Sequence, residues 1–185
     1  MPIRLRAIGV TLGKSVTFYG MPIVSMSKGS LISINDKVVL CSDSRFTALG
    51  VNHPVVLRTL RSGAQIVIGE NTGMSGGSIC AAVSVVVGKE CLVGANVTIT
   101  DTDFHALKPE NRRSNVNDCD IKCSKVDIGN NVFIGTGAVV LKGVTIGLNS
   151  VVGAHSLISR NIPRDVVWLG GRANHTDIAN YRSLI

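Results

Sequence analysis

The chain has 185 residues, which is the size of one domain. Seven aromatic residues beside 20 glycines and many valines and isoleucines favour a narrow core over a sandwich or Rossmann core. The formal net charge is +7, but no run of four basic residues and no aromatic platform accompanies it, which argues against nucleic-acid binding and favours a phosphate-bearing or anionic ligand. No apolar stretch reaches the roughly 18 residues of a membrane span, and none at the N-terminus predicts a signal peptide. We therefore expect a cytoplasmic protein without membrane insertion.

The first third of the chain carries a weak six-residue period. Ile34 and Leu40 are six residues apart, and Asn35 follows the first of them where later repeats have glycine. Residues 23–31 are a candidate for one more coil. The segment 44–62 breaks the period and contains three arginines, so we expect it to be a loop within degenerate coils that span about residues 16–62.

The period becomes clear from about residue 63. Ile68, Met74 and Cys80 keep the six-residue step, and after the gain of one residue the step resumes at Val87, Val93 and Ile99. The polar segment 105–125 then interrupts it. Insertions in a repeat structure emerge as loops, so this segment is predicted to project from the coils.

The period is most regular between residues 128 and 158. An apolar β-branched anchor stands at every sixth position: Ile128, Ile134, Val140, Ile146, Val152 and Ile158. Glycine follows four of these six anchors. The residue four positions after each anchor is small or branched. This period is neither the 3.6 of a helix nor the 2 of a strand. It predicts three-sided coils that stack on one another, with glycine at the corners because it reaches positive φ without a Cβ clash.

After Ile158 the period fades. Residues 166–169 predict a last strand, and Thr176 to Leu184 predict a short helix that caps the open end of the core. The whole chain, residues 1–185, is thus predicted to be one all-β domain. It has main coils over about 63–170, a projecting loop over about 105–125 and a C-terminal cap over 171–185.

The repeats resemble those of the hexapeptide-repeat acyltransferases, whose fold is a left-handed parallel β-helix. The resemblance covers about residues 64–173 and is closest to the saccharide O-acetyltransferase subgroup. It is carried by the coils of residues 128–160 and by three motifs, Met74-Ser-Gly-Gly-Ser-Ile-Cys-Ala-Ala82, Asp101-Thr-Asp-Phe-His105 and Leu141-Lys-Gly-Val-Thr-Ile-Gly147. It implies a homotrimer with acetyl-CoA in a groove between two subunits, and it places the catalytic histidine at His105.

The chemistry of acyl transfer suits the residues of the second motif. A hydroxyl must lose its proton as it attacks a thioester, and histidine is a suitable general base near neutral pH. Asp101, Asp103 and His105 alternate, so an extended backbone would place all three on one face, where a carboxylate orients the imidazole. We expect direct attack without an acyl-enzyme.

The resemblance also suggests binding residues. It places acetyl-CoA against Thr136, Ala154, Ser159 and Arg160, with Lys142 and Arg172 facing its phosphates. Candidates for contact with the acceptor are His53 in the first loop, and Arg112 and Arg113 in the second. For each of these residues a solvated surface position is the alternative. No metal site is expected.

Several functions remain open at this point. The first is a CoA-dependent O-acetyltransferase for a sugar hydroxyl in capsule, lipopolysaccharide or exopolysaccharide synthesis, and a close rival acetylates an amine or another small acceptor. A γ-type carbonic anhydrase needs three histidine ligands for zinc, but the four histidines, at positions 53, 105, 155 and 175, include no closely spaced pair. A scaffold without activity is the remaining alternative.

Overall fold

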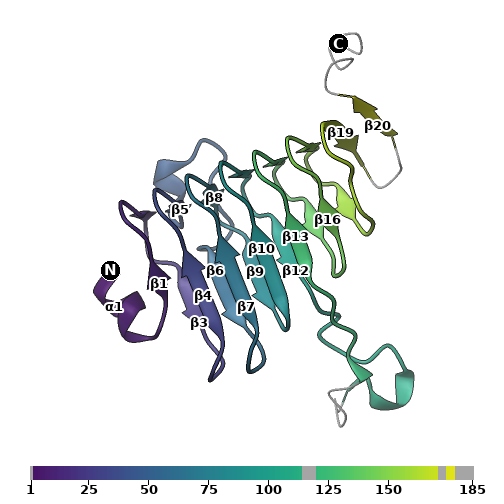
Figure 1. Cartoon of the computed structure of the whole chain (residues 1–185), viewed down its shortest axis with the longest axis horizontal. Coiled ribbons are helices and arrows are strands. Elements are labelled where there is room, and N and C mark those ends of the chain that lie inside the picture. The colour runs from purple at the N-terminus through teal and green to yellow at the C-terminus, as the bar shows by residue number, and fades with distance from the viewer. Residues whose placement is uncertain (1, 114–119, 171–173, 178–185) are drawn as a thin grey trace.

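The computed structural model describes residues 2–113, 120–170 and 174–177. Over these residues short parallel strands wind through six coils, each with one strand on each of three faces. Figure 1 shows the coils stacked along the long axis of the molecule, with the N-terminal and C-terminal segments at opposite ends. The expectation of an all-β fold built of stacked coils is confirmed.

The three faces of the coils are called A, B and C in chain order. Face A holds β1 (Thr11–Leu12), β4 (Leu31–Ile34), β7 (Gln65–Ile68), β10 (Ser84–Val87), β13 (Val126–Ile128) and β16 (Thr145–Ile146). Face B holds β2 (Thr17–Tyr19), β5 (Val39–Cys41), β8 (Gly73–Ser75), β11 (Leu92–Val93), β14 (Phe133–Ile134), β17 (Val151–Val152), β19 (Val166–Leu169) and β20 (Asn174–Asp177). Face C holds β3 (Ile23–Ser25), β6 (Val56–Thr59), β9 (Ser78–Ala81), β12 (Thr98–Thr100), β15 (Val139–Val140) and β18 (Leu157–Ile158).

The repeat anchors form the core. All six predicted anchors between residues 128 and 158 are at most 3% exposed, and they belong to one continuous apolar cluster. Each anchor pairs in register with the anchor one coil away, as Ile134 does with Val93 and Val152. β-branched side chains of similar size therefore fill this narrow part of the interior.

The glycines after the anchors have a different role from the one predicted. Gly129 and Gly147 do not have positive φ, and a Cβ at Gly129 would lie 2.7 Å from the backbone nitrogen of Leu148. These glycines are needed because neighbouring coils approach closely there. The left-handed corner position comes two residues later and is occupied by side chains that are mostly Asn or acidic: Asn71, Glu90, Asn131 and Asn149.

This difference leads to a matched test of stability. Gly129→Ala should lower the free energy of unfolding by about 1 to 3 kcal/mol, because the methyl group collides with the backbone of the next coil. Gly73→Ala is the control, since its nearest neighbour would be Leu92 Cδ2 at 3.9 Å, and it should change stability by less than about 1 kcal/mol. Urea denaturation of both variants measures the effect, and equal stabilities would contradict the close-approach explanation.

One predicted anchor and the bounds of one predicted loop are corrected. Ile79, not Cys80, is the buried anchor of β9, because the corner at Gly76 and Gly77 shortens the step from Met74 to the next anchor from six residues to five. The predicted loop over 44–62 is also too long, since β6 lies within it and pairs with β3 and β9.

The two ends of the stack differ from expectation. The helix α1 (Pro2–Ala7), which no pattern predicted, places Leu5 in the core at the first coil. At the other end Trp168 of β19 is buried, and β19 pairs with β20 in antiparallel fashion. The helix predicted from Thr176 is therefore wrong at its start, where the chain is still a strand, and its remainder (178–184) lies outside the described residues.

Two insertions leave the coils at different corners. The first, residues 42–55 with the 3₁₀ turn η1 (Ser44–Phe46), joins face B to face C. The second, residues 101–125 with the 3₁₀ turn η2 (Pro109–Asn111), joins face C to face A. In Figure 1 they project on opposite sides of the stack, the first beside β5 and the second below β12.

Candidate functional site

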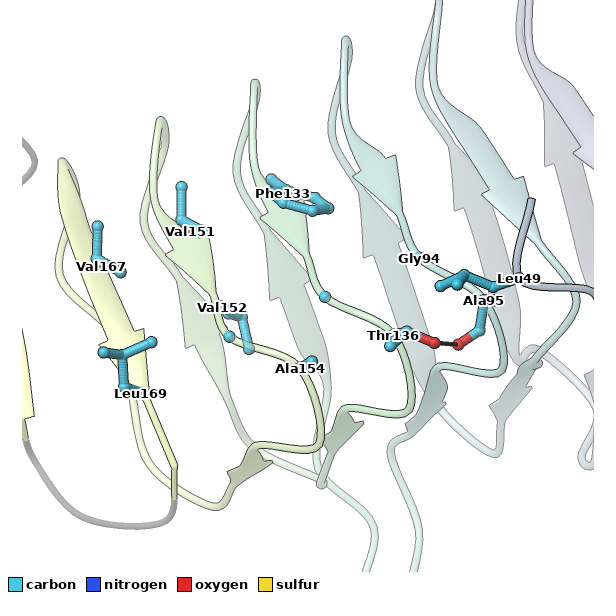
Figure 2. Close-up of a pocket in the computed structure, with 12 residues that line it drawn as sticks. Leu49, Gly94, Ala95, Phe133, Thr136, Val151, Val152, Ala154, Val167 and Leu169 are labelled. Carbon is cyan, nitrogen blue, oxygen red and sulfur yellow. Dashed lines mark hydrogen bonds between the residues drawn. The ribbon is translucent and has the colours of Figure 1, made fainter. Parts of the chain in front are cut away.

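A groove follows the corner between faces B and C over the later coils. Three successive coils present glycine followed by a small residue at this corner, as Gly94-Ala95, Gly135-Thr136 and Gly153-Ala154. The groove has a volume of about 820 Å³, and Figure 2 shows the side chains around it. Its other lining residues are almost all apolar: Leu49, Phe133, Val151, Val152, Val167 and Leu169. A long, slender ligand fits such a trough better than a compact one.

Backbone hydrogen bonds make the wall of this groove rigid. The amides of Gly94, Gly135 and Gly153 each donate to a carbonyl of the following coil at 2.7 to 2.8 Å. The Thr136 hydroxyl donates to the Ala95 carbonyl at 2.7 Å, and this bond is drawn in Figure 2. The small residues are therefore held in line, and the groove exists before any ligand binds.

The first insertion closes one end of the groove. Leu49 lines the groove although 75% of its surface is exposed. The loop behind it is anchored, because the Asn52 amide donates to Asn96 Oδ1 at 2.8 Å and the Val51 amide donates to the Ser44 hydroxyl at 3.1 Å. Leu49 is thus an apolar side chain presented to the groove by a braced loop.

An ion pair at the base of the same loop holds its first turn. The Asp43 carboxylate accepts hydrogen bonds from the Arg45 side chain and from the Arg45 amide, and these lower the pKa of Asp43 to about 2. The stabilisation from this pair is therefore complete above the unfolded pKa near 3.8 and is lost as the pH falls through about 2. At neutral pH the turn keeps its charge pair.

His105 lies at the corner between faces C and A, at the start of the second insertion. Its side chain is exposed, and its amide donates to the Asp103 carbonyl at 2.7 Å across Phe104, which has a φ of 60°. This is a γ-turn. The predicted extended backbone is absent here, so Asp101, Asp103 and His105 do not share one face as expected. His105 is not among the residues that line the groove.

Asp101, which the sequence predicts to be catalytic, has its carboxylate bound to the backbone. Its side chain is fully buried, and its carboxylate accepts hydrogen bonds from the amides of Ala82, Val83 and Ser84, each at 2.7 Å. Both of its oxygens therefore bind the corner between β9 and β10. Three amides satisfy a buried carboxylate and fix that corner.

Asp103 and Lys142 form an ion pair. Lys142 Nζ lies 2.5 Å from Asp103 Oδ1, and both side chains are mostly buried. The sequence placed Lys142 at a cofactor phosphate, but in this structure it lies beside the turn that carries His105. The reason is the stacking of coils, which brings the corner after β15 next to the exit of β12.

The remaining predicted cofactor residues divide between two places. Thr136 and Ala154 line the groove. Ser159 and Arg160 follow β18 (Leu157–Ile158) at the far corner of face C. The Arg160 guanidinium carbon lies over the Trp168 ring, 5.6 Å from the ring centroid. Ser159 and Arg160 do not line the groove, and Arg160 instead covers the end of the core. Arg172 lies outside the described residues.

The predicted acceptor residues are exposed and separated. His53 lies in the first insertion, with its Nδ1 2.7 Å from the Pro54 carbonyl oxygen. Arg112 and Arg113 lie in the second insertion, where the Arg112 guanidinium donates to the Leu107 carbonyl at 2.8 Å. Within one chain the two insertions project on opposite sides (Figure 1), so these residues do not form one site.

Sequence reasoning missed the apolar side of the groove. Leu49, Phe133, Val151 and Leu169 line it, and none was singled out. A usable signal was present, because Leu92, Phe133 and Val151 stand one position before the anchors of face B and therefore point outward. Leu49 offered no such signal, since a loop residue has no periodic position.

The described part of the chain has neither a metal-ligand cluster nor a membrane-spanning helix. No group of three or more His, Cys, Asp or Glu side chains there is placed to hold a metal ion. Within the same residues, no helix is long and apolar enough to cross a membrane.

Two family patterns match the repeats. The bacterial transferase hexapeptide family (six repeats) matches residues 125–160, and the hexapeptide repeat of succinyl-transferase matches residues 65–101. Galactoside O-acetyltransferases of Lactococcus lactis and Escherichia coli are 43% and 39% identical over 86 and 87 residues. These regions are 46% and 47% of this chain, and the chain spans only about two fifths (39% and 40%) of the length of these relatives.

Solved structures agree with the fold. A galactoside acetyltransferase in complex with coenzyme A is 34% identical with a TM-score of 0.56, over 64% of this chain and 57% of that one. A hexapeptide-repeat acetyltransferase of Vibrio cholerae complexed with acetyl coenzyme A is 28% identical with a TM-score of 0.53, over 60% and 58% of the two chains. The coils accordingly form the left-handed parallel β-helix that was predicted. The chain therefore carries transferase hexapeptide repeats and is similar to hexapeptide-repeat acetyltransferases, saccharide O-acetyltransferases among them.

Proposed function

We propose that this chain is a cytoplasmic, CoA-dependent O-acetyltransferase that transfers the acetyl group of acetyl-CoA to a hydroxyl of a sugar. The observation that carries this proposal is the groove of small residues stacked over three coils, Gly94-Ala95, Gly135-Thr136 and Gly153-Ala154. Its length and apolar lining suit a pantetheine arm. The relatives named above act on galactosides, and the solved ones bind coenzyme A or acetyl coenzyme A.

The proposed reaction needs one base. His105 takes the proton of the acceptor hydroxyl as the oxygen attacks the thioester carbonyl. A backbone N–H at the corner of a coil stabilises the oxyanion, and the tetrahedral intermediate collapses to the acetyl ester. The CoA thiolate leaves and receives the proton from His105, so the base is restored without an acyl-enzyme.

A homotrimer supplies the missing proximity between base and groove. His105 and Ala95 belong to the same coil, on either side of β12, at different corners. In a ring of three subunits whose threefold axis is parallel to the long axis of the stack, equivalent coils of the three subunits lie at the same height. His105 of one subunit then faces the groove of the next at the end where Ala95 and Leu49 lie, and the thioester belongs at that end.

The acceptor class is tested by thiol release from acetyl-CoA with a panel of sugars and their amino-sugar counterparts. We expect release with hydroxyl acceptors in the class used for capsule, lipopolysaccharide or exopolysaccharide synthesis. Release only with the amino sugars would favour N-acetylation instead. If activity also falls on dilution to monomer, as measured by sedimentation, the shared site is supported; full activity of the monomer would contradict it.

Occupation of the groove is tested by Ala154→Phe. A ring at this corner would fill the trough, so we expect the KM for acetyl-CoA to rise at least about tenfold, which corresponds to roughly 1.4 kcal/mol. Leu148→Phe is the matched control, because Leu148 follows a glycine at the corner between faces A and B, away from the groove. An unchanged KM in Ala154→Phe would show that acetyl-CoA lies elsewhere.

A further inference from the structure

The pair of Asp103 and Lys142 connects two segments that are far apart in sequence. Lys142 follows β15 at the corner of the fifth coil, and Asp103 lies at the exit of the fourth. Their charged atoms are 2.5 Å apart, and the exposed fractions of the two side chains are 28% for Lys142 and 19% for Asp103. The next residue, Gly143, donates its amide to the Ser124 carbonyl at the returning end of the insertion. The pair is therefore part of a close junction, not a surface contact.

The Asp103 carboxylate depends on this lysine. Its other oxygen, Oδ2, is buried, and no hydrogen-bond partner for it lies among the residues that the structure describes. A mostly buried carboxylate with one cationic partner is destabilised when that partner is removed, because no other group compensates its charge. The backbone must then shift to hydrate it.

The backbone that would shift carries His105. The carbonyl of Asp103 accepts a hydrogen bond from the His105 amide at 2.7 Å, and Phe104 between them has a φ of 60°. A bulky side chain in this region costs about 1 to 3 kcal/mol and persists only where its surroundings hold it. The Asp103 amide donates to the Lys122 carbonyl at 3.1 Å, and the Phe104 amide donates to the Thr102 hydroxyl at 3.1 Å. The ion pair adds a charged side-chain contact to this set of restraints.

We propose that Lys142 is a positioning residue, which holds Asp103 and through it the γ-turn that aims His105. Its effect on turnover depends on the proposed function, whereas its effect on the turn does not. Other titratable groups on the adjoining segments are Asp101, which is bound to three amides, the exposed Lys122 and Lys125, and Cys123, whose thiol donates to the Thr102 hydroxyl.

The first test follows the turn without any assay of activity. In Lys142→Met, amide hydrogen exchange over residues 102–106 should become faster, because the γ-turn loses its restraint. Lys142→Arg should keep most of the protection. Lys125→Met is the control: Lys125 is 70% exposed and pairs with Asp127 at 3.0 Å, so its loss should leave this segment unchanged. Unchanged exchange in Lys142→Met would overturn the proposal.

The second test separates positioning from phosphate binding. Lys142→Met should lower kcat by about 10- to 100-fold, the size expected for a displaced catalytic group, and should leave the KM for acetyl-CoA within about twofold. A raised KM with normal kcat would assign Lys142 to the cofactor. Absence of transfer in the unmodified protein, together with faster exchange in Lys142→Met, would refute the proposed function alone.

Discussion

Replacing His105 with alanine should lower kcat by about 10²- to 10⁴-fold, the usual contribution of a general base. The KM for acetyl-CoA should hardly change, because His105 is outside the groove that the cofactor is proposed to occupy. Both constants come from the rate of thiol release at saturating acceptor. The expectation depends on direct attack by the hydroxyl, in which the proton must be removed as the bond to carbon forms.

The control for this variant is Lys108→Ala. Lys108 is exposed in the same insertion, and its side chain does not cap η2. It should retain the turnover of the unmodified protein. If His105→Ala retains it as well, the base has been assigned wrongly, and the histidine at the end of Asp-Thr-Asp-Phe-His is only a surface residue.

Replacing Asp101 with alanine should lower the free energy of unfolding by at least about 3 kcal/mol. The carboxylate accepts three amide hydrogen bonds in the core, and hydrogen bonds to a charged group contribute about 1.5 to 3 kcal/mol each, although they are not additive. Without it, the buried amides of Ala82 and Ser84 lose their acceptor. Urea denaturation at neutral pH measures the loss.

Asp127→Ala is the matched control for a carboxylate in a paired but exposed position. Its partner Lys125 is 70% exposed, and such a pair contributes about 1 kcal/mol or less. A similar small loss in Asp101→Ala would show that the corner does not depend on the carboxylate. A large loss of turnover in Asp101→Ala under conditions where it stays folded would restore the catalytic role that the alternation of Asp101, Asp103 and His105 had suggested.

The coils were predictable because their cause is local. Each side of a three-sided coil points apolar side chains into a narrow core, so Ile134 and its equivalents must be apolar and must recur at a fixed spacing. The register fails at Cys80 for the same reason. Counting assumes six residues for each side, whereas the Gly76-Gly77 corner allows five, and nothing in the spacing distinguishes Ile79 from Cys80 as the anchor.

The glycines show a pattern that was read correctly and explained wrongly. Their place after the anchors was plain, but the reason for it lies one coil away, at the backbone of the neighbouring coil. A sequence contains no distance between Gly129 and Leu148. The left-handed corner was assigned to the glycine because residues that prefer positive φ are known, while close approach between coils is visible only after folding.

Some residues of the candidate site were predictable from the sequence, and others became visible only in the folded chain. The resemblance to the acyltransferases singled out Thr136, Ala154 and His105, and the break in the repeat placed the histidine at the head of an insertion. Leu49 closes the groove because its loop is braced by Asn96, and Lys142 meets Asp103 because their corners are stacked. These two contacts join residues 44 and 39 positions apart, and a period of six carries no information about them. The linear pattern thus specifies which side chains point inward, since that depends on each strand alone, whereas the packing of one coil on another determines which outward side chains meet.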